Sequence, residues 1–301
     1  MRILNFGSLN VDYVYTVPHF VQPGETLRAI RKQVHPGGKG LNQSIALARA
    51  GAAVFHAGCA GEGSEWLVQM LRDSGADVSH VRRVRALQGN AVIEVNEAGE
   101  NRIIVFGGSN QCVTSRQIEE TLAAFDAGDV LLLQNEINDV AQIADAAYAR
   151  GLRIVFNPSP CNGEALRVDL GKADWLLVNE TEARQISGQT QPQVVWQTLH
   201  SRYPTLSVLL TLGAAGSIAF PAEGEPIRQP AFPVQAVDST AAGDTFTGYF
   251  LAGLQENLPL QTCMVRASAA AAVSVTRAGA APSIPDRREV DAFLARTAAR
   301  E

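Results

Sequence analysis

The sequence predicts an α/β fold: a central, mostly parallel sheet flanked by helices, with a small antiparallel β lid. Three observations predict it. Apolar strand-like runs alternate with helical patterns along most of the chain, which favours a parallel sheet covered on both faces. Two early regions carry strand patterns without a helix to make a parallel crossover, and the last third is mainly helical. We therefore predict one domain, residues 1–301, with a lid at about 11–35 and 89–107.

The elements of the main domain are short strands and amphipathic helices in turn. The predicted strands are 2–6, 54–57, 130–133, 153–156, 175–178 and 208–212. The predicted helices between them are 41–50, 65–73, 116–125, 139–150 and 194–200. Gly51 and Gly151 follow two of these helices, as residues that end a helix in the left-handed conformation often do. Three further helices, 243–256, 260–277 and 286–299, complete the chain.

The predicted lid combines two segments. Residues 11–35 read as extended and alternating, interrupted by Pro18 and Pro23. Residues 90–106 alternate apolar and polar side chains around a turn at 97–100, which is typical of a β-hairpin. We interpret both as one antiparallel sheet that projects from the domain. The alternative is a peripheral hairpin that extends the main sheet.

Composition narrows the class of protein. The 301 residues are 46% hydrophobic with a net charge of −5, and no apolar run approaches the roughly 18 residues of a membrane span. Asn5, Asn10 and Asp12 interrupt the start too early for a secretory signal, and Lys/Arg runs are lacking. We expect a cytoplasmic protein with neither a membrane nor a nucleic-acid partner. The four cysteines lie far apart, so we expect reduced thiols.

Several nucleotide-binding signatures are missing from the chain. The Walker A loop, the dinucleotide-binding G-x-G-x-x-G and the protein-kinase signatures do not occur. The strongest local signal is instead residues 238–248, DSTAAGDTFTG, which lead into a helix. Small residues at 241–243 let the backbone approach a ligand, and N–H groups at a helix start form an anion site. Asp244 would then lie beside a bound phosphate and take a proton from an attacking hydroxyl. The alternative is an acid that only favours the helix dipole.

Two earlier motifs suit a polyol. Residues 37–42, GGKGLN, permit close backbone approach, and Asn42 offers both a donor and an acceptor. Residues 7–12, GSLNVD, place Asn10 and Asp12 on one side of an extended strand, where their oxygens can accept hydrogen bonds from hydroxyls. The alternatives are a glycine-rich turn and ordinary surface turn chemistry.

Two later motifs follow apolar strands. Residues 179–182, NETE, and 211–216, TLGAAG, lie where open α/β sheets bind ligands, at the carboxyl ends of strands. Glu182 could act through water on a Mg²⁺ carried by nucleotide phosphates. The alternative for 179–182 is a helix cap.

The order and spacing of these motifs resemble the ribokinase branch of the PfkB carbohydrate-kinase family, from about residue 3 to 295. The resemblance implies a ribokinase-like fold, ATP as phosphate donor, Mg²⁺, an activating K⁺, and a homodimer formed through the lid. It implies phosphate transfer to a sugar hydroxyl, first of all the 5-hydroxyl of D-ribose. Another sugar or a nucleoside as acceptor, or a non-catalytic sugar- or nucleotide-binding protein, are the alternatives.

The resemblance also implies a role for individual residues. Asp244 would be the general base, and the backbone of Ala241, Ala242, Gly243 and Asp244 its anion hole. The sugar contacts would be Asn10, Asp12, Gly38, Lys39, Asn42, Glu136 and Asp244. The nucleotide contacts would be Asn179, Thr211, Gly213, Gly216, Gly243 and Ser268, the last standing where the family often carries His or Asn. Potassium would bind at a loop formed by Asp238, Thr240, Ser274, Arg277, Gly279 and Ser283, and magnesium near Glu182 through water.

Overall fold

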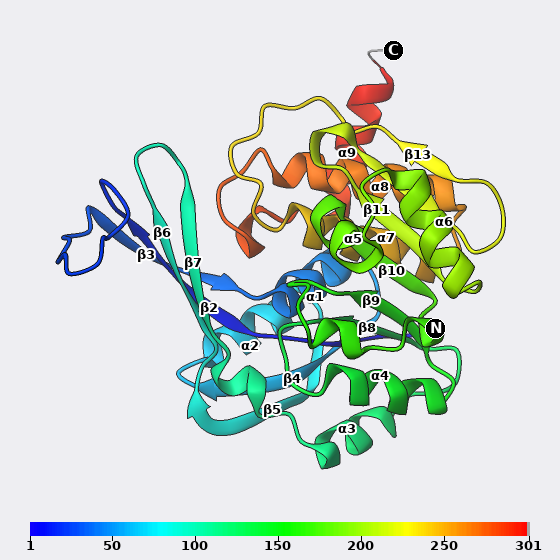
Figure 1. Cartoon of the computed structure of the whole chain (residues 1–301), viewed down its shortest axis with the longest axis horizontal. Helices are drawn as coiled ribbons and strands as arrows, with labels where there is room; N and C mark the ends of the chain where they lie inside the picture. Colours follow the sequence, from blue (N-terminus) through cyan, green and yellow to red (C-terminus); the bar gives the residue numbers. More distant parts are fainter. Residues whose placement is uncertain (300–301) are drawn as a thin grey trace.

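A large central sheet organises the protein, which we describe from a computed structural model over residues 1–299 (Figure 1). Within these residues the sheet has nine strands in the order β13-β12-β11-β10-β9-β8-β1-β4-β5. The seven strands from β11 to β5 run parallel, and β12 and β13 are antiparallel additions at one edge. The prediction of a mostly parallel sheet is confirmed. The strands are β1 (Ile3–Phe6), β4 (Val54–Glu62), β5 (Asp77–Leu87), β8 (Val130–Gln134), β9 (Arg153–Asn157), β10 (Trp175–Asn179), β11 (Ser207–Thr211), β12 (Ser217–Phe220) and β13 (Ile227–Gln229).

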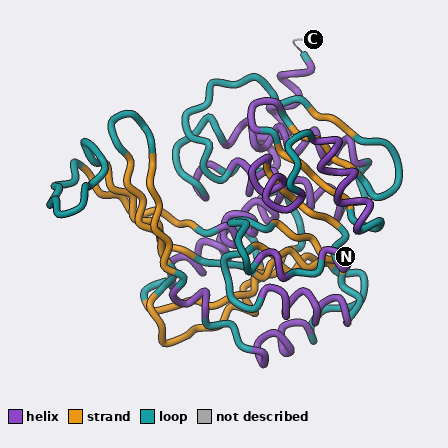
Figure 2. Tube along the Cα trace, in the orientation of Figure 1, coloured by secondary structure: helices purple, strands orange, loops and turns teal. Residues whose placement is uncertain are grey.

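Helices cover both faces of this sheet (Figure 2). One face packs against α1 (Lys39–Arg49), α2 (Glu65–Asp73), α7 (Ala242–Gln255), α8 (Leu260–Ser274) and α9 (Arg287–Ala298). The other packs against α3 (Ser115–Leu122), α4 (Val140–Ala149), α5 (Glu180–Ser187) and α6 (Pro192–Arg202). Successive strand residues supply the two cores in turn, because side chains alternate across a strand: Ile3 belongs to the first core and Leu4 to the second. Over residues 1–299 no helix is both long and apolar enough to cross a membrane.

The second sheet corresponds to the predicted lid and is formed by β2 (Asn10–Thr16), β3 (Arg31–Gly37), β6 (Asn90–Val95) and β7 (Asn101–Phe106) in the order β3-β2-β6-β7. It projects from the main body at the left of Figure 1. Its outer pairs are antiparallel, as predicted, whereas the central pair β2–β6 is parallel. The two segments therefore form a separate sheet, and the alternative of a hairpin that extends the main sheet is wrong.

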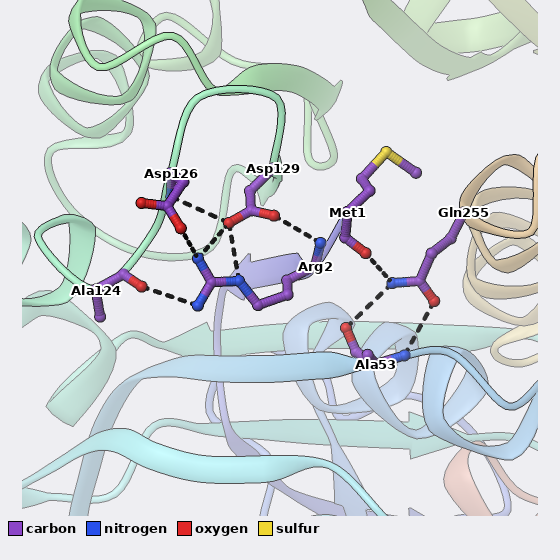
Figure 3. A network of polar contacts seen from close by, with 7 residues as sticks. All are labelled: Met1, Arg2, Ala53, Ala124, Asp126, Asp129 and Gln255. Carbon is purple, nitrogen blue, oxygen red and sulfur yellow. Dashed lines mark hydrogen bonds and ion pairs between the residues drawn. The ribbon is translucent and has the colours of Figure 1, made fainter.

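A polar network ties the amino ends of the strands to the far end of α7 (Figure 3). The Arg2 guanidinium donates to the carboxylates of Asp126 and Asp129, which precede β8. The Gln255 amide, at the end of α7, donates to the Met1 and Ala53 carbonyls and accepts from the Ala53 N–H at 3.0 Å. These contacts fix where α7 lies along the sheet, so its first turn lies at the opposite, carboxyl edge of the strands.

Candidate active site

A cleft of about 510 Å³ lies at the carboxyl ends of β9, β10 and β11, beside the first turn of α7. Strand ends and helix starts meet at this edge, as expected for an open α/β sheet. Of the predicted site residues, the cleft is lined by Lys39, Asn179, Glu182, Thr211, Gly213, Ala241, Ala242, Gly243 and Asp244. The structure therefore brings together residues from four separate sequence motifs.

The start of α7 is shaped for close approach by a ligand. Ala241, the residue before the helix, has a left-handed backbone with φ 61°, and the Ala242 N–H donates to the Ser239 carbonyl at 3.2 Å. A methyl group built on Gly243 would meet nothing within 4 Å. Since the first N–H groups of a helix lack intrahelical acceptors, Gly243 and Asp244 offer the donors for an anion here.

Asp244 is 7% exposed, and two side-chain amides hold its carboxylate. Asn42 donates to Oδ2 at 3.0 Å, and Gln43 donates to Oδ1 at 2.8 Å. A buried carboxylate needs such partners to offset the loss of hydration. The sequence motifs singled out Asn42 but not Gln43. The signal was present in the polar run Asn42–Gln43–Ser44, which occupies turns of α1 that are fully buried.

Close packing of α1 against α7 brings those amides within reach. A methyl group on Gly248 would lie 2.4 Å from the Cβ of Ala46 and 2.8 Å from the Leu47 nitrogen. Gly248 lies one turn after Asp244 on α7, and Ala46 lies one turn after Asn42 on α1. The glycine therefore sets the spacing at which Asn42 and Gln43 contact Asp244.

A second cluster of acids lies where the lid joins the main body. Glu136 accepts hydrogen bonds from the Ser8 hydroxyl and, at 2.8 Å, from the Lys39 backbone N–H. Burial raises the pKa of Glu136, an effect that Lys39 and Ser8 oppose. Asp12, on lid strand β2, fits against a glycine: a methyl group on Gly37 would lie 2.1 Å from its Oδ2. Burial, with a further contribution from Glu136, raises the pKa of Asp12 to about 7.

Other predicted sugar contacts lie in the same region. Asn10 is buried at the start of β2, where its Oδ1 accepts from the Asn110 amide at 2.7 Å. Gly38, with φ 93°, immediately precedes α1. Lys39 follows it and faces three acids: burial works against its charge, but Asp244, Glu136 and Glu182 outweigh that effect and raise the pKa of its ammonium group. Lys39 thus connects the acid cluster to the cleft.

The motif at 179–182 forms a helix cap and lines the cleft at the same time. Asn179 Oδ1 accepts from the Glu182 N–H at 2.9 Å, and Glu182 Oε2 accepts from the Asn179 N–H at 3.0 Å. This reciprocal pair is a capping box. The helix cap that was the alternative interpretation of this motif is therefore present, and both side chains also border the cleft.

Two predicted nucleotide contacts lie elsewhere. Gly216 is absent from the residues that line the cleft, and a methyl group on it would lie 2.1 Å from the Gln229 carbonyl oxygen. Close packing between β12 and β13 therefore explains why residue 216 is a glycine. Ser268 is 6% exposed on α8, and its hydroxyl donates to the Pro230 carbonyl at 3.4 Å. Neither contact with a nucleotide is tested by this geometry, and both stay predictions.

The predicted potassium loop is assembled from two distant segments. Asp238 accepts from the Thr240 N–H and hydroxyl through Oδ1 and from the Gly279 N–H at 2.9 Å through Oδ2. Partial burial raises the pKa of Asp238, but these donors outweigh it and the net pKa is lowered. Ser274 and Ser283 are buried, each bonded to a carbonyl three residues back. Arg277 instead pairs with Glu289 on α9.

Comparison with known proteins identifies the family. Residues 2–287 match the model of the pfkB family carbohydrate kinases. The chain is 35% identical to a ribokinase of Haemophilus influenzae over 96% of each chain. Its structure is similar to a ribokinase of Thermotoga maritima (TM-score 0.87, 35% identity, 98% and 99% of the two chains). It is also similar to an Arabidopsis thaliana ribokinase complexed with ribose and ATP (TM-score 0.86, 31% identity, 97% and 98%). The chain therefore belongs to the pfkB family of carbohydrate kinases.

Proposed function

We propose that the protein is an ATP-dependent ribokinase that phosphorylates the 5-hydroxyl of D-ribose. One observation carries the proposal: a buried carboxylate, Asp244, lies at a helix start that opens into a cleft, next to a cluster of sugar-type acceptors. The relatives named ribokinase, including one complexed with ribose and ATP, support this choice of acceptor and donor.

The proposed reaction uses Asp244 as general base. Its carboxylate takes the proton of the sugar hydroxyl as the hydroxyl oxygen bonds to the γ-phosphorus, and the bond from that phosphorus to ADP breaks. The N–H groups of Gly243 and Asp244 and the ammonium group of Lys39 stabilise negative charge on the transferred group. Asn10, Asp12 and Glu136 hold the other sugar hydroxyls.

The metal ions belong to the same proposal. Mg²⁺ takes hard oxygen ligands, commonly through water, and the Glu182 carboxylate at the edge of the cleft fits that role. Bound Mg²⁺ would neutralise charge on the nucleotide phosphates. Potassium would be held by oxygens, largely of the backbone, from Asp238, Thr240, Ser274, Arg277, Gly279 and Ser283, and carbonyl oxygens suit K⁺. The Arg277 side chain is paired with Glu289, so this residue would contribute its backbone oxygen.

A test of the function is an ADP-release assay with a panel of sugars and nucleosides. With Mg²⁺ we expect D-ribose to be the preferred acceptor, and turnover to be faster in K⁺ than in Na⁺. Strong preference for another acceptor would overturn the ribose assignment alone. A panel in which no acceptor releases ADP would overturn kinase activity and favour a non-catalytic binding protein.

Sugar binding should strengthen as the pH rises through about 7. Asp12 has its pKa raised to about 7, so it is largely protonated below that pH. A hydroxyl donating to its carboxylate favours the ionised form, so binding releases a proton. We expect the ribose Kd, measured by calorimetry, to increase by up to about tenfold per pH unit below 7. Asp12→Asn should bind more weakly and lose this pH dependence, and an unchanged slope in that variant would exclude Asp12 as its source.

We also propose a cytoplasmic homodimer that pairs through the lid. All six residues of β7 are exposed, among them Ile103 (54%), Ile104 (71%) and Val105 (62%). Neighbouring strand residues face opposite ways, so each face of the lid carries exposed apolar side chains, and a second lid would cover one of these faces. The four free thiols suit a reducing compartment.

Sedimentation should detect a species with the mass of two chains. Ile104→Lys is expected to shift it toward one chain, because a charge would be buried between the lids. Leu166→Lys, at another exposed apolar position (58%) on the main body, is the control and should leave the mass unchanged. A single-chain mass for the unaltered protein would overturn the dimer.

A further inference from the structure

We propose that Gln43 is a positioning residue for Asp244, and that a chain of buried amides behind Gln43 fixes its orientation. The inference rests on the proposed role of Asp244 as base. Gln43 is completely buried. Its Nε2 donates to Asp244 Oδ1 at 2.8 Å and to Asn157 Oδ1 at 3.0 Å, while its Oε1 accepts from Gln134 Nε2 at 2.7 Å. All the hydrogen-bonding atoms of its side chain are thus engaged.

The orientation of an amide matters here, because a reversed Gln43 would present an oxygen to the carboxylate. Backbone carbonyls, which can only accept, settle it. Asn5 donates to the Gly40 carbonyl at 2.8 Å, so its Oδ1 must face Gln134, which donates to it at 2.9 Å. The same Gln134 amide nitrogen is therefore the donor to Gln43 Oε1, and the Nε2 of Gln43 is directed toward Asp244.

The second neighbour of Gln43 is fixed in the same way. Asn157 donates to the Leu177 carbonyl at 3.0 Å, which leaves its Oδ1 as the acceptor for Gln43. Two independent backbone anchors, on α1 and on β10, thus enforce one orientation of Gln43. Reversal would place oxygen against oxygen at both Asp244 and Asn157, a costly arrangement in a buried site.

The two carboxylate oxygens of Asp244 have different partners. Oδ1 is held from behind by Gln43, in a layer that is closed to solvent. Oδ2 is shared with Asn42, whose own Oδ1 is buried without a partner within residues 1–299. Gln43 therefore fixes the plane of the carboxylate through Oδ1, and Oδ2 is the oxygen that we infer receives the proton.

Gln43→Met tests the inference, since it keeps the length of the side chain and removes the amide. We expect kcat to fall about 10- to 100-fold, as a misplaced reacting group would cause. The KM for ATP and the calorimetric Kd for ribose should change less than about twofold. Gln117→Met is the matched control: this glutamine is also buried and donates to a backbone carbonyl, of Gly58, but contacts neither Asp244 nor its partners. It should lower thermal stability without lowering kcat.

A double-mutant cycle separates positioning from general damage. Gln134→Met removes one of the two residues that orient Gln43 and should lower kcat by a smaller factor than Gln43→Met does. The double variant should be no slower than Gln43→Met alone, because the orienting contact acts only through Gln43. Additive losses in kcat would overturn the relay, and wild-type kcat in Gln43→Met would overturn the inference. Should Gln43→Met fail to fold, a wild-type kcat in folded Gln43→Asn, whose side chain is one methylene too short to keep the contact with Asp244, would overturn it equally.

Different results would disprove the proposed function and the role of Gln43. A protein that releases no ADP with any acceptor, or an Asp244→Asn variant with full turnover, would remove the proposed function. An inactive Asp244→Asn beside a fully active Gln43→Met would remove only the role of Gln43.

Discussion

Replacing Asp244 by asparagine is expected to lower kcat by about 10²- to 10⁴-fold, the usual contribution of a general base. The asparagine has the same shape and keeps an oxygen for the amide of Gln43, so the cleft should survive. It cannot take a proton from the sugar hydroxyl. ATP and ribose should still bind, with affinities measured by calorimetry close to those of the unaltered protein, while single-turnover phosphate transfer becomes slow.

A control for this variant is Asp291→Asn, the same chemical change at an exposed position on α9 away from the cleft. It should leave turnover unchanged. Full activity in Asp244→Asn would show that another group takes the proton. Loss of ribose and ATP binding together with turnover would instead show that the carboxylate maintains the structure of the site.

Gly248→Ala should lower the free energy of unfolding by about 1–3 kcal/mol, the usual cost of overpacking a close contact. Its methyl group would overlap Ala46 and the backbone of Leu47, so α7 and α1 must move apart. Because Asp244 and the amides of Asn42 and Gln43 lie one turn away on the same two helices, kcat should fall as well. Urea denaturation and the ADP-release assay measure the two effects on one preparation.

The matched variant is Gly243→Ala on the same helix. A methyl group there meets nothing within 4 Å, so the free energy of unfolding should be unchanged or higher by up to about 1 kcal/mol, since alanine favours a helix. The methyl group would instead occupy space that a phosphate needs, and the KM for ATP should rise. Equal stability in the two variants would show that close contact between α1 and α7 is not required.

Local patterns predicted most of the main domain. The apolar runs that became β1, β8, β9, β10 and β11 are buried on both faces, so their composition alone marks them as parallel strands. The edge strand β5, and the strands β12 and β13 at the other side of the sheet, were not predicted. β5 carries Arg82, Arg83 and Arg85 on an exposed edge, and such charges discourage pairing with other chains and hide the strand pattern.

The site was predictable where a short motif carries its own chemistry. Asp244 follows three small residues, and Asn179 and Glu182 lie at the end of a strand. The local sequence alone was therefore enough to predict them as site residues. Gln134 could not be predicted, because it looks like an ordinary polar residue until tertiary packing buries it. The only sequence signal for Gln43 was its place in the polar run 42–44. The parallel pairing of β2 with β6 was likewise decided by long-range packing between segments about eighty residues apart. The sequence pattern of a hairpin predicts only the pairing of strands that follow each other along the chain.

The contact between Gln43 and Asp244 joins residues 201 positions apart. During synthesis the chain emerges from its amino end, and early segments can fold before later ones exist. The amides of Asn5, Gln43 and Gln134 are therefore made long before the carboxylate for which they are arranged. Until α7 docks, these buried amides include donors without their acceptor, which disfavours a stable, partly folded state. The nascent chain thus gains a complete core and a complete active site in the same late event.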